Sequence, residues 1–328
     1  MAYTTIDDPE EYFNTVLWTG NGSNRDITGV GFEPNFTWIK QRNDVFSHVL
    51  GNSISGDNKF LVSSSESAES TDSDKFRTFV SDGFQVGTHN GVNGNSNTYV
   101  GWSWKESATA GFDIVGYTGN GNARTISHSL SAVPSMMIVK SRSSANKPWG
   151  VYHHKNTSAP ETDFLSLNNT NATADSSAFW SDTAPTSSVF TVGTSNDVNE
   201  NGTTYIAYLF SEKKGYSKFG SYTGNGNADG TFIYLGFKPA FIIAKKTSST
   251  SDWGIYDNKR NTFNVMDLRL KANSNGADDQ SSDNNIDFLS NGFKHRTASG
   301  WNAAATYIYM AFAENPFVTS TGIPTTAR

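Results

Sequence analysis

Three short runs of this chain carry bulky apolar residues, which alternate with other residues or, at 205–210, occupy nearly every position. Each run begins with Thr-Tyr, and the three lie at residues 98–104, 204–210 and 306–312. A strand with one solvated face alternates apolar and polar residues, whereas a strand covered on both faces is bulky throughout. The pattern therefore predicts a β-strand in each run, and the strand at 205–210 is expected to be covered on both faces, as in a packed sandwich.

The segments around these runs recur in the same order, so the chain contains three copies of one unit. An aromatic residue followed by Thr-Gly-Asn-Gly opens each copy, with intervals of 99 residues (18 to 117) and 105 residues (117 to 222). A proline turn and an apolar run ending in lysine follow, at 31–40, 130–140 and 236–245. A further strand pattern lies at 81–87, 188–193 and 290–294. A unit of this length is large enough to bury a core of its own.

A Trp-Gly pair distinguishes the second and third copies from the first. Trp149 begins Trp-Gly-Val-Tyr and Trp253 begins Trp-Gly-Ile-Tyr, whereas the first copy has a looser match, Phe-Ser-His-Val-Leu at 46–50. Because both tryptophans recur at one place in the repeat, we expect them to pack in the core. The Asn-Gly of the Thr-Gly-Asn-Gly motif is expected to form a tight turn with positive φ between strands.

These patterns predict an all-β chain of three tandem antiparallel β-sandwich domains, of the jelly-roll or concanavalin-like kind. The predicted domains span 1–107, with an N-terminal extension as a candidate anchor, then 108–214, then 215–328 with a C-terminal tail. The one good helix start, near residues 7–13, is expected to give a single turn. The linkers are very short, so we expect domains that touch and form a compact or bent rod.

Composition supports the β class and excludes several functions. Charged residues make up 17% of the chain and aromatic residues 13%, a profile typical of strands joined by Gly/Asn turns. The chain has no cysteine, so neither disulfides nor thiolate metal sites hold the fold. The net charge of −6 argues against nucleic acid as the main partner. The apolar runs are too short for membrane insertion, and no secretory signal opens the chain, so we expect synthesis in the cytoplasm.

Candidate metal ligands are few and poorly spaced. The adjacent His153 and His154 lack a helical zinc-site context, and we expect them to be surface-loop residues. Acids in two polar loops, Asp72 with Asp74 and those within 278–283, do not have the ligand spacing of a calcium loop. Solvated side chains are the favoured interpretation of these acids, with bound calcium as the alternative. The sequence predicts no metal and no cofactor.

Candidate catalytic residues fare no better. Glu161 and Asp163 have the spacing of two acids found in some sandwich glycosidases, but the third acid of that pattern is absent and the other copies lack the pair. No serine lies in a nucleophile elbow, and no phosphate-binding or dinucleotide fingerprint occurs. We therefore predict no catalytic residues and a protein that is not an enzyme.

Tryptophans in the variable loops are the best candidates for ligand binding. An exposed tryptophan offers a large flat face for a sugar ring together with an N–H donor. Trp180 precedes Ser-Asp-Thr and Trp301 follows Ser-Gly, in the middle regions where the copies differ most. Binding loops are expected to diversify in this way. We predict Trp180 and Trp301 as glycan-binding residues, with core packing as the alternative.

Three parts of the repeat frame also carry a resemblance to known proteins. They are the aromatic-Thr-Gly-Asn-Gly motif, the Ile/Val-Lys after the proline turn, and Trp-Gly-Val-Tyr, with residues 183–190 as the most recognisable segment. This frame resembles a repeat domain in structural proteins of tailed bacteriophages, notably phages of marine bacteria and cyanobacteria. The ends, 12–17 and 314–320, are similar to the ends of such proteins. The resemblance implies a virion appendage or tail-fibre-type protein built from lectin-like β-sandwiches, and it supplies no catalytic residues.

The expected function is attachment rather than chemistry. We expect a non-enzymatic virion structural protein that binds host surface glycans through outer loops of the second and third domains, with weak sites strengthened by many copies. Its expected partners are other virion proteins and host glycans, and we expect a homo-oligomer. The alternative is a capsid decoration or appendage-building protein with no ligand. No heptad or collagen-like shaft is present, which departs from a typical fibre.

Overall fold

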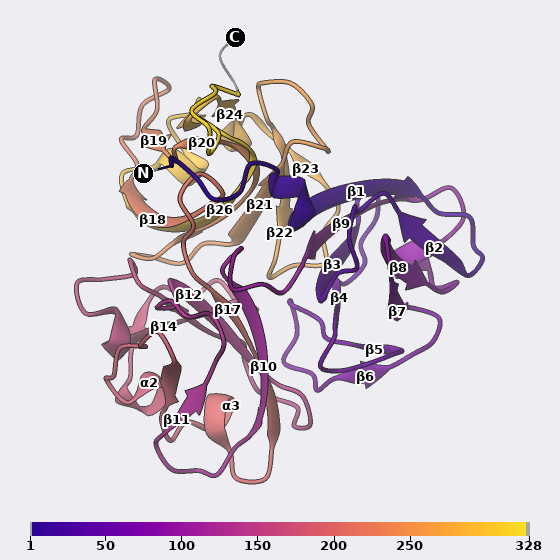
Figure 1. Ribbon diagram of the computed structural model, residues 1–328, viewed down its shortest axis with the longest axis vertical. Helices are drawn as coiled ribbons and strands as arrows, with labels where there is room; N and C mark the ends of the chain where they lie inside the picture. The colour runs from indigo at the N-terminus through magenta and orange to yellow at the C-terminus, as the bar shows by residue number, and fades with distance from the viewer. Residues whose placement is uncertain (1, 326–328) are drawn as a thin grey trace.

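The three bulky runs form long strands inside antiparallel sheets, as predicted. The computed structural model describes residues 2–325 and shows an all-β protein (Figure 1). The runs are β9 (Thr98–Trp104), β17 (Thr204–Phe210) and β26 (Thr306–Pro316), which are buried along most of their length. Within residues 2–325, no helix is long and apolar enough to cross a membrane.

Each repeat has a large inner sheet and a small outer sheet. Repeat one has the inner order β1-β9-β3-β4 and the outer order β2-β8-β7, with β5 and β6 as a separate pair. Its other elements are η1 (Pro9–Glu11), β1 (Phe13–Thr19), β2 (Arg25–Thr28), β3 (Phe36–Gln41), β4 (Val49–Asn52), β5 (Lys59–Phe60), β6 (Ser70–Thr71), β7 (Phe76–Val80), β8 (Gly83–Val86) and α1 (Asn90–Asn93). The single turn η1 is the expected one, and Asp8 caps it.

Repeat two has the inner order β10-β17-β12-β13-β14-β15 and an outer pair of β11 with β16. Its other elements are β10 (Phe112–Thr118), β11 (Arg124–Ser127), β12 (Met136–Ser141), β13 (Gly150–His153), η2 (Pro160–Thr162), β14 (Asp163–Ser166), β15 (Ala174–Asp175), α2 (Ser177–Trp180), β16 (Val189–Val192) and α3 (Asn196–Asn199).

Repeat three has the inner order β18-β26-β20-β21-β22-β23 and the outer order β19-β25-β24. Its other elements are β18 (Ser217–Thr223), β19 (Phe232–Tyr234), β20 (Phe237–Lys246), β21 (Trp253–Asp257), β22 (Leu268–Lys271), β23 (Asp279–Gln280), η3 (Ser282–Asn284), β24 (Ile286–Leu289), β25 (Gly292–His295) and η4 (Gly300–Asn302).

The two faces of each inner sheet are buried against different partners. In β17, Tyr205 and Leu209 belong to the core between the two sheets of repeat two. The alternate residues Ile206, Tyr208 and Phe210 belong instead to a core at the centre of the molecule. This arrangement confirms that the strand at 205–210 is covered on both faces, because side chains alternate between the faces of a strand.

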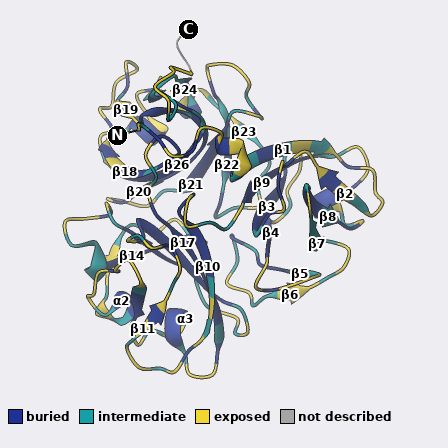
Figure 2. Cartoon of the chain, viewed as in Figure 1, coloured by how far each residue is buried: buried dark blue, intermediate teal, exposed yellow. Residues whose placement is uncertain are grey.

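The central core is shared by all three repeats. Aromatic rings meet across the boundaries, with centroid distances of 5.0 Å for Phe13 and Phe312, 4.5 Å for Phe36 and Tyr208, and 6.1 Å for Phe210 and Phe312. Figure 1 shows the repeats as three lobes around one centre, and Figure 2 shows buried strands gathered there. The rod expectation is wrong, because the second bulky face of each inner sheet is buried against the other two repeats.

Equivalent backbone hydrogen bonds join each repeat to another and close the ring. The donor immediately precedes a short strand of one repeat (β6, β15 or β23), and the acceptor lies two residues after the lysine that ends the apolar run of the other. The three bonds run from Glu69 N to Arg142 O (2.8 Å), from Thr173 N to Thr247 O (3.0 Å) and from Asp278 N to Arg42 O (2.7 Å). Repeats one and two, two and three, and three and one are therefore joined in the same way, about a pseudo-threefold axis.

A second ring of contacts explains the looser match in copy one. Trp149 Nε1 donates to Val62 O (3.1 Å) and Trp253 Nε1 to Ser166 O (2.9 Å), each in another repeat. At the equivalent position, His48 Nε2 lies 3.1 Å from Lys271 O, while its Nδ1 accepts from a neighbouring tryptophan at 2.7 Å. That acceptor role assigns the proton of His48 to Nε2. Histidine thus replaces tryptophan in repeat one, and its ring N–H still donates a hydrogen bond to a backbone oxygen of another repeat.

The Thr-Gly-Asn-Gly segments form turns that lead from the inner to the outer sheet. The second glycine of each motif has positive φ, +70° at Gly22, +76° at Gly121 and +63° at Gly226, as predicted. A buried asparagine of each repeat holds the turn, as Asn199 does when its Oδ1 accepts from Asn120 N at 3.0 Å. The motif therefore has a structural role, as a tight turn held by hydrogen bonds to the buried asparagine.

Candidate functional site

The two tryptophans predicted to bind glycans are buried core residues. Trp180 is 0% exposed and donates from Nε1 to Asp163 O at 3.0 Å. Trp301 is 2% exposed, and its ring lies against Gly254, where an added Cβ would come within 2.7 Å. Each lies at or within a short helical turn, α2 or η4, which directs the ring inward. The prediction of exposed sugar-stacking rings at Trp180 and Trp301 is therefore wrong, whereas Trp149 and Trp253 are buried as expected.

The histidine pair is not a surface-loop feature. His153 ends β13 and is 1% exposed, with Nε2 3.1 Å from Tyr309 O of repeat three. Burial lowers the pKa of His153 to about 3, so the ring is neutral at physiological pH. His154 is half-buried, with Nε2 2.9 Å from Phe219 O. The expectation of surface-loop histidines is therefore wrong for His153, because this strand end faces another repeat.

The acids of the two polar loops make contacts within the protein. Asp278 has a 13% exposed side chain held by two arginines, so the expectation of a solvated acid is wrong there. In the other loop, Asp72 Oδ1 accepts the backbone N–H of Asp74 at 2.9 Å. Across residues 2–325, no group of three or more His, Asp or Glu side chains has an arrangement that could hold a metal ion.

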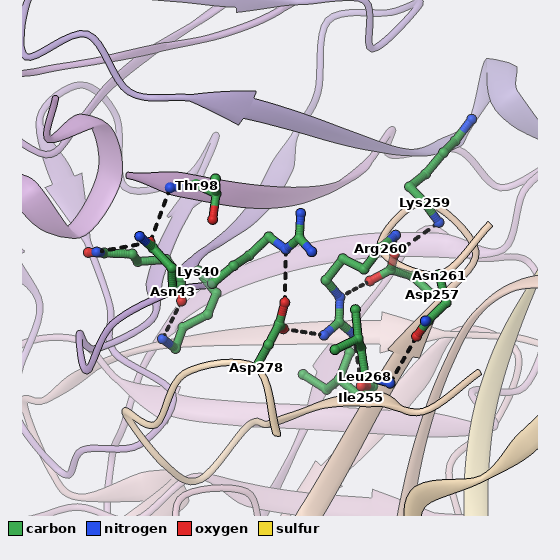
Figure 3. A network of polar contacts seen from close by, with 12 residues as sticks. Lys40, Asn43, Thr98, Ile255, Asp257, Lys259, Arg260, Asn261, Leu268 and Asp278 are labelled. Carbon is green, nitrogen blue, oxygen red and sulfur yellow. Dashed lines mark hydrogen bonds and ion pairs between the residues drawn. The ribbon is translucent and has the colours of Figure 1, made fainter. Parts of the chain in front are cut away.

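The most buried charged cluster closes the ring between repeats three and one (Figure 3). Arg260 and Asp257 have fully buried side chains, with Nε 2.5 Å from Oδ2. Arg260 Nη1 also lies 2.7 Å from Asp278, which in turn pairs with Arg42 of repeat one at 2.9 Å. Trp102 of repeat one donates to Asp257 at 3.1 Å. Because the carboxylates are occupied by arginines and an indole, the cluster offers no free acid for catalysis.

The lysine that ends each apolar run is buried at a boundary between repeats. Lys140 Nζ donates to Glu66 O of repeat one at 3.2 Å, and Lys245 Nζ donates to Thr170 O of repeat two at 3.2 Å. Lys40, in repeat one, is attracted by Asp278 of repeat three. Burial lowers the pKa of all three lysines to about 8. Backbone oxygens cover the ammonium groups, so these lysines hold the repeats together.

An open hollow lies between repeats two and three. It has a volume of about 680 Å³, and β18 and β19 of repeat three line it together with His154 and Lys155 of repeat two. Two of its aromatic side chains are exposed, Phe232 by 44% and Tyr234 by 51%. Large exposed rings beside a hollow are typical of a binding site.

A second hollow continues the first. It has a volume of about 380 Å³ and shares Lys155, Ser221 and Tyr222 with the larger one. Hydroxyl and amide side chains dominate its lining, namely those of Asn156, Thr157, Ser221, Thr223, Thr247 and Thr306. We call the two hollows together the seam groove. One end presents aromatic rings and the other presents hydroxyl groups.

A family match spans all three repeats. The match is to a family described as a domain of unknown function, DUF7483, and it covers residues 8–316. The chain belongs to the DUF7483 family. Among curated proteins, none matches the chain. The extent of the DUF7483 match coincides with the whole three-lobed body rather than with one repeat.

The residue equivalent to Lys155 of the seam groove makes different contacts at each of the three boundaries of this DUF7483 chain. Ile54, two residues after β4, covers the inner sheet of repeat two, where a Cβ added to Gly116 would lie 3.0 Å from its side chain. Lys155 and Lys259 have the equivalent positions after β13 and β21. Lys259 pairs with Glu10 at 3.3 Å, whereas no carboxylate lies within ion-pair distance of Lys155 among the described residues.

Comparison of the repeats gives the signal that the sequence interpretation missed. The outward positions of the first outer strand are Asp26 and Thr28 in repeat one, and the equivalent positions of repeat two are also polar. In β19 of repeat three they are Phe232 and Tyr234, on either side of a buried isoleucine. Aromatic residues at positions that are polar in the sister repeats indicate a role outside the core.

Proposed function

We propose that this protein is a non-enzymatic structural protein of a tailed-bacteriophage virion, of the tail-fibre or appendage type, that holds host surface glycans in the seam groove. The observation that carries the proposal is the pair of exposed rings, Phe232 and Tyr234, at one end of a groove lined by hydroxyl groups at the other. The likeness of the repeat motifs to those of phage structural proteins supports the virion setting. The proposed partners are host glycans, other virion proteins and further copies of the chain.

The physical chemistry of sugars fits such a groove. The C–H face of a pyranose packs on an aromatic ring, and its hydroxyls pair with side-chain hydroxyls and amides. A single shallow site of this kind binds weakly, but many copies on one particle raise the overall avidity. The groove therefore suits reversible attachment better than acid–base catalysis by paired carboxylates, because Glu212 is the one acid among its lining residues.

The experiment replaces the two rings by the residues of repeat two. The double variant Phe232→Thr with Tyr234→Ser copies the equivalent positions Thr125 and Ser127, so the strand is expected to keep its fold. Adhesion of the labelled protein to host cells should fall at least tenfold. Phe263→Ser, which removes an 82% exposed ring outside the groove, is the matched control and should leave adhesion unchanged. Equal adhesion of the double variant and the wild type would contradict the proposal.

An architectural role is the second candidate, and the pseudo-threefold arrangement favours it. A body with three equivalent faces can sit where three copies of another virion protein meet, as a capsid decoration or appendage-building protein does. Antibody labelling of purified virions separates the two roles. Label at tail or fibre tips supports attachment, whereas label over the head together with no glycan binding supports decoration.

A further inference from the structure

The seam groove concentrates positive charge on an acidic protein. The chain has a formal net charge of −6, yet Lys155 and Lys218 both line the groove. Neither lysine has a carboxylate within ion-pair distance in the described part of the chain. The one acid of the lining, Glu212, accepts the backbone N–H of Phe219 at 3.3 Å. Two lysines therefore face one carboxylate in this space.

The two lysines occupy defined places. Lys155 is exposed and is one of the residues that line both hollows. Lys218 is held at the aromatic end, with Nζ donating to Tyr234 O at 2.9 Å and lying 5.3 Å from the centre of the Tyr234 ring. A cation fixed beside an aromatic ring can pair with an acidic group of a ligand while the ring stacks on a flat face of the same ligand.

We propose that the glycan held in the seam groove is anionic, a polysaccharide segment that carries carboxylate or sulfate groups. This inference rests on the proposed function and adds the ligand class. An acid group of one sugar pairs with Lys155. The next ring stacks on Tyr234 and Phe232 with a second acid group near Lys218, and the hydroxyls on the other side pair with Ser221 and Thr157. The two lysines outnumber the single lining carboxylate, Glu212, and neither forms an ion pair with it, so an anionic sugar gains an attraction that a neutral sugar lacks.

The test compares acidic oligosaccharides with uncharged counterparts of the same skeleton. The probes are tetragalacturonate with its methyl ester, and a κ-carrageenan tetrasaccharide with its desulfated form. Binding to the full chain is measured by isothermal titration calorimetry at 50 and 300 mM NaCl. At least one acidic probe should bind ten times more tightly than its partner, and the difference should shrink at the higher salt concentration because exposed charges are screened.

Variants separate this inference from the proposed function. Lys155→Gln should weaken the acidic probe at least tenfold and lower host-cell adhesion. The control Lys105→Gln changes an exposed lysine that also lies near a tyrosine ring, 6.0 Å from Tyr12, but outside the groove. It should change neither quantity.

Two results overturn the anionic ligand. One is equal binding of charged and uncharged probes, or no binding of any probe. The other is host-cell adhesion that survives Lys155→Gln but is lost in the Phe232→Thr, Tyr234→Ser variant, which would leave the proposed function standing with a neutral glycan. Adhesion that survives the double ring variant would remove the proposed function itself.

Discussion

Removing the guanidinium of Arg260 tests whether the three repeats unfold as one body. In Arg260→Met, the buried Asp257 loses a partner 2.5 Å away, and Asp278 loses one at 2.7 Å. Asp257 keeps the Trp102 indole at 3.1 Å, which does not neutralise its charge. Breaking a buried pair from one side costs about 3–5 kcal/mol of the free energy of unfolding.

The expected shift of the melting temperature depends on the size of the cooperative unit. Unfolding entropy is about 2.1 cal/mol/K per residue, which gives about 0.7 kcal/mol/K for the 328 residues together. A loss of about 4 kcal/mol then lowers Tm by about 6 °C. If the third repeat unfolded alone, its entropy would be about a third as large and the same loss would lower its Tm by roughly 17 °C.

Differential scanning calorimetry distinguishes the two cases. We expect one transition with equal calorimetric and van't Hoff enthalpies, shifted by about 6 °C in Arg260→Met. The control is Lys294→Met, which breaks a 2.5 Å pair with Asp229 within repeat three, where the aspartate is 79% exposed. That change should cost under about 1 kcal/mol. Two separate transitions, or a large shift confined to one of them, would refute the view that the shared core makes the repeats a single cooperative body.

Three further predictions concern single positions. The unfolded chain protonates His153 below pH 6.5, whereas burial holds the pKa of His153 in the folded protein at about 3. The free energy of unfolding should therefore fall by about 1.4 kcal/mol per pH unit as the pH drops from 6.5 towards 3. Measurements of Tm at pH 7 and pH 5 test this, and the drop in Tm should be smaller in His153→Gln. Trp253→Phe leaves Ser166 O without its 2.9 Å donor and should cost about 1–3 kcal/mol in urea unfolding, and an unchanged midpoint would contradict the role of the ring N–H. Gly119→Ala places a Cβ 2.2 Å from a backbone oxygen of the facing loop and should lower Tm, whereas Gly276→Ala, with 3.5 Å of clearance, should not.

Much of the fold could be predicted because two-sided burial leaves a local signature. In β17, bulky residues at successive positions show that both faces are covered, whatever covers them. The same signature does not say which surface lies opposite, and here one partner is another repeat rather than a second sheet of the same one. Strand positions therefore followed from the sequence, whereas the closed ring did not.

The candidate site could not be predicted, because exposure depends on what lies across from a side chain. Trp301 follows small polar residues, yet Gly254 on the facing strand leaves room for its ring and the side chain is buried. Tyr234 alternates with a buried residue as a core aromatic would, yet its side chain is 51% exposed in the hollow between repeats two and three. The useful signal was the difference between repeats at one position, which becomes visible once their strands are aligned in space.

Because all three repeats belong to one chain, the three boundaries between them can acquire substitutions independently. In a trimer of identical subunits, one substitution appears at all three boundaries, so a pocket opened at one of them opens at every one. Here the boundaries are encoded separately: Ile54 packs near Gly116 at one, Lys259 pairs with Glu10 at another, and Lys155 lines a hollow at the third. Two boundaries can therefore go on supporting the scaffold while the third is free to follow a changing ligand.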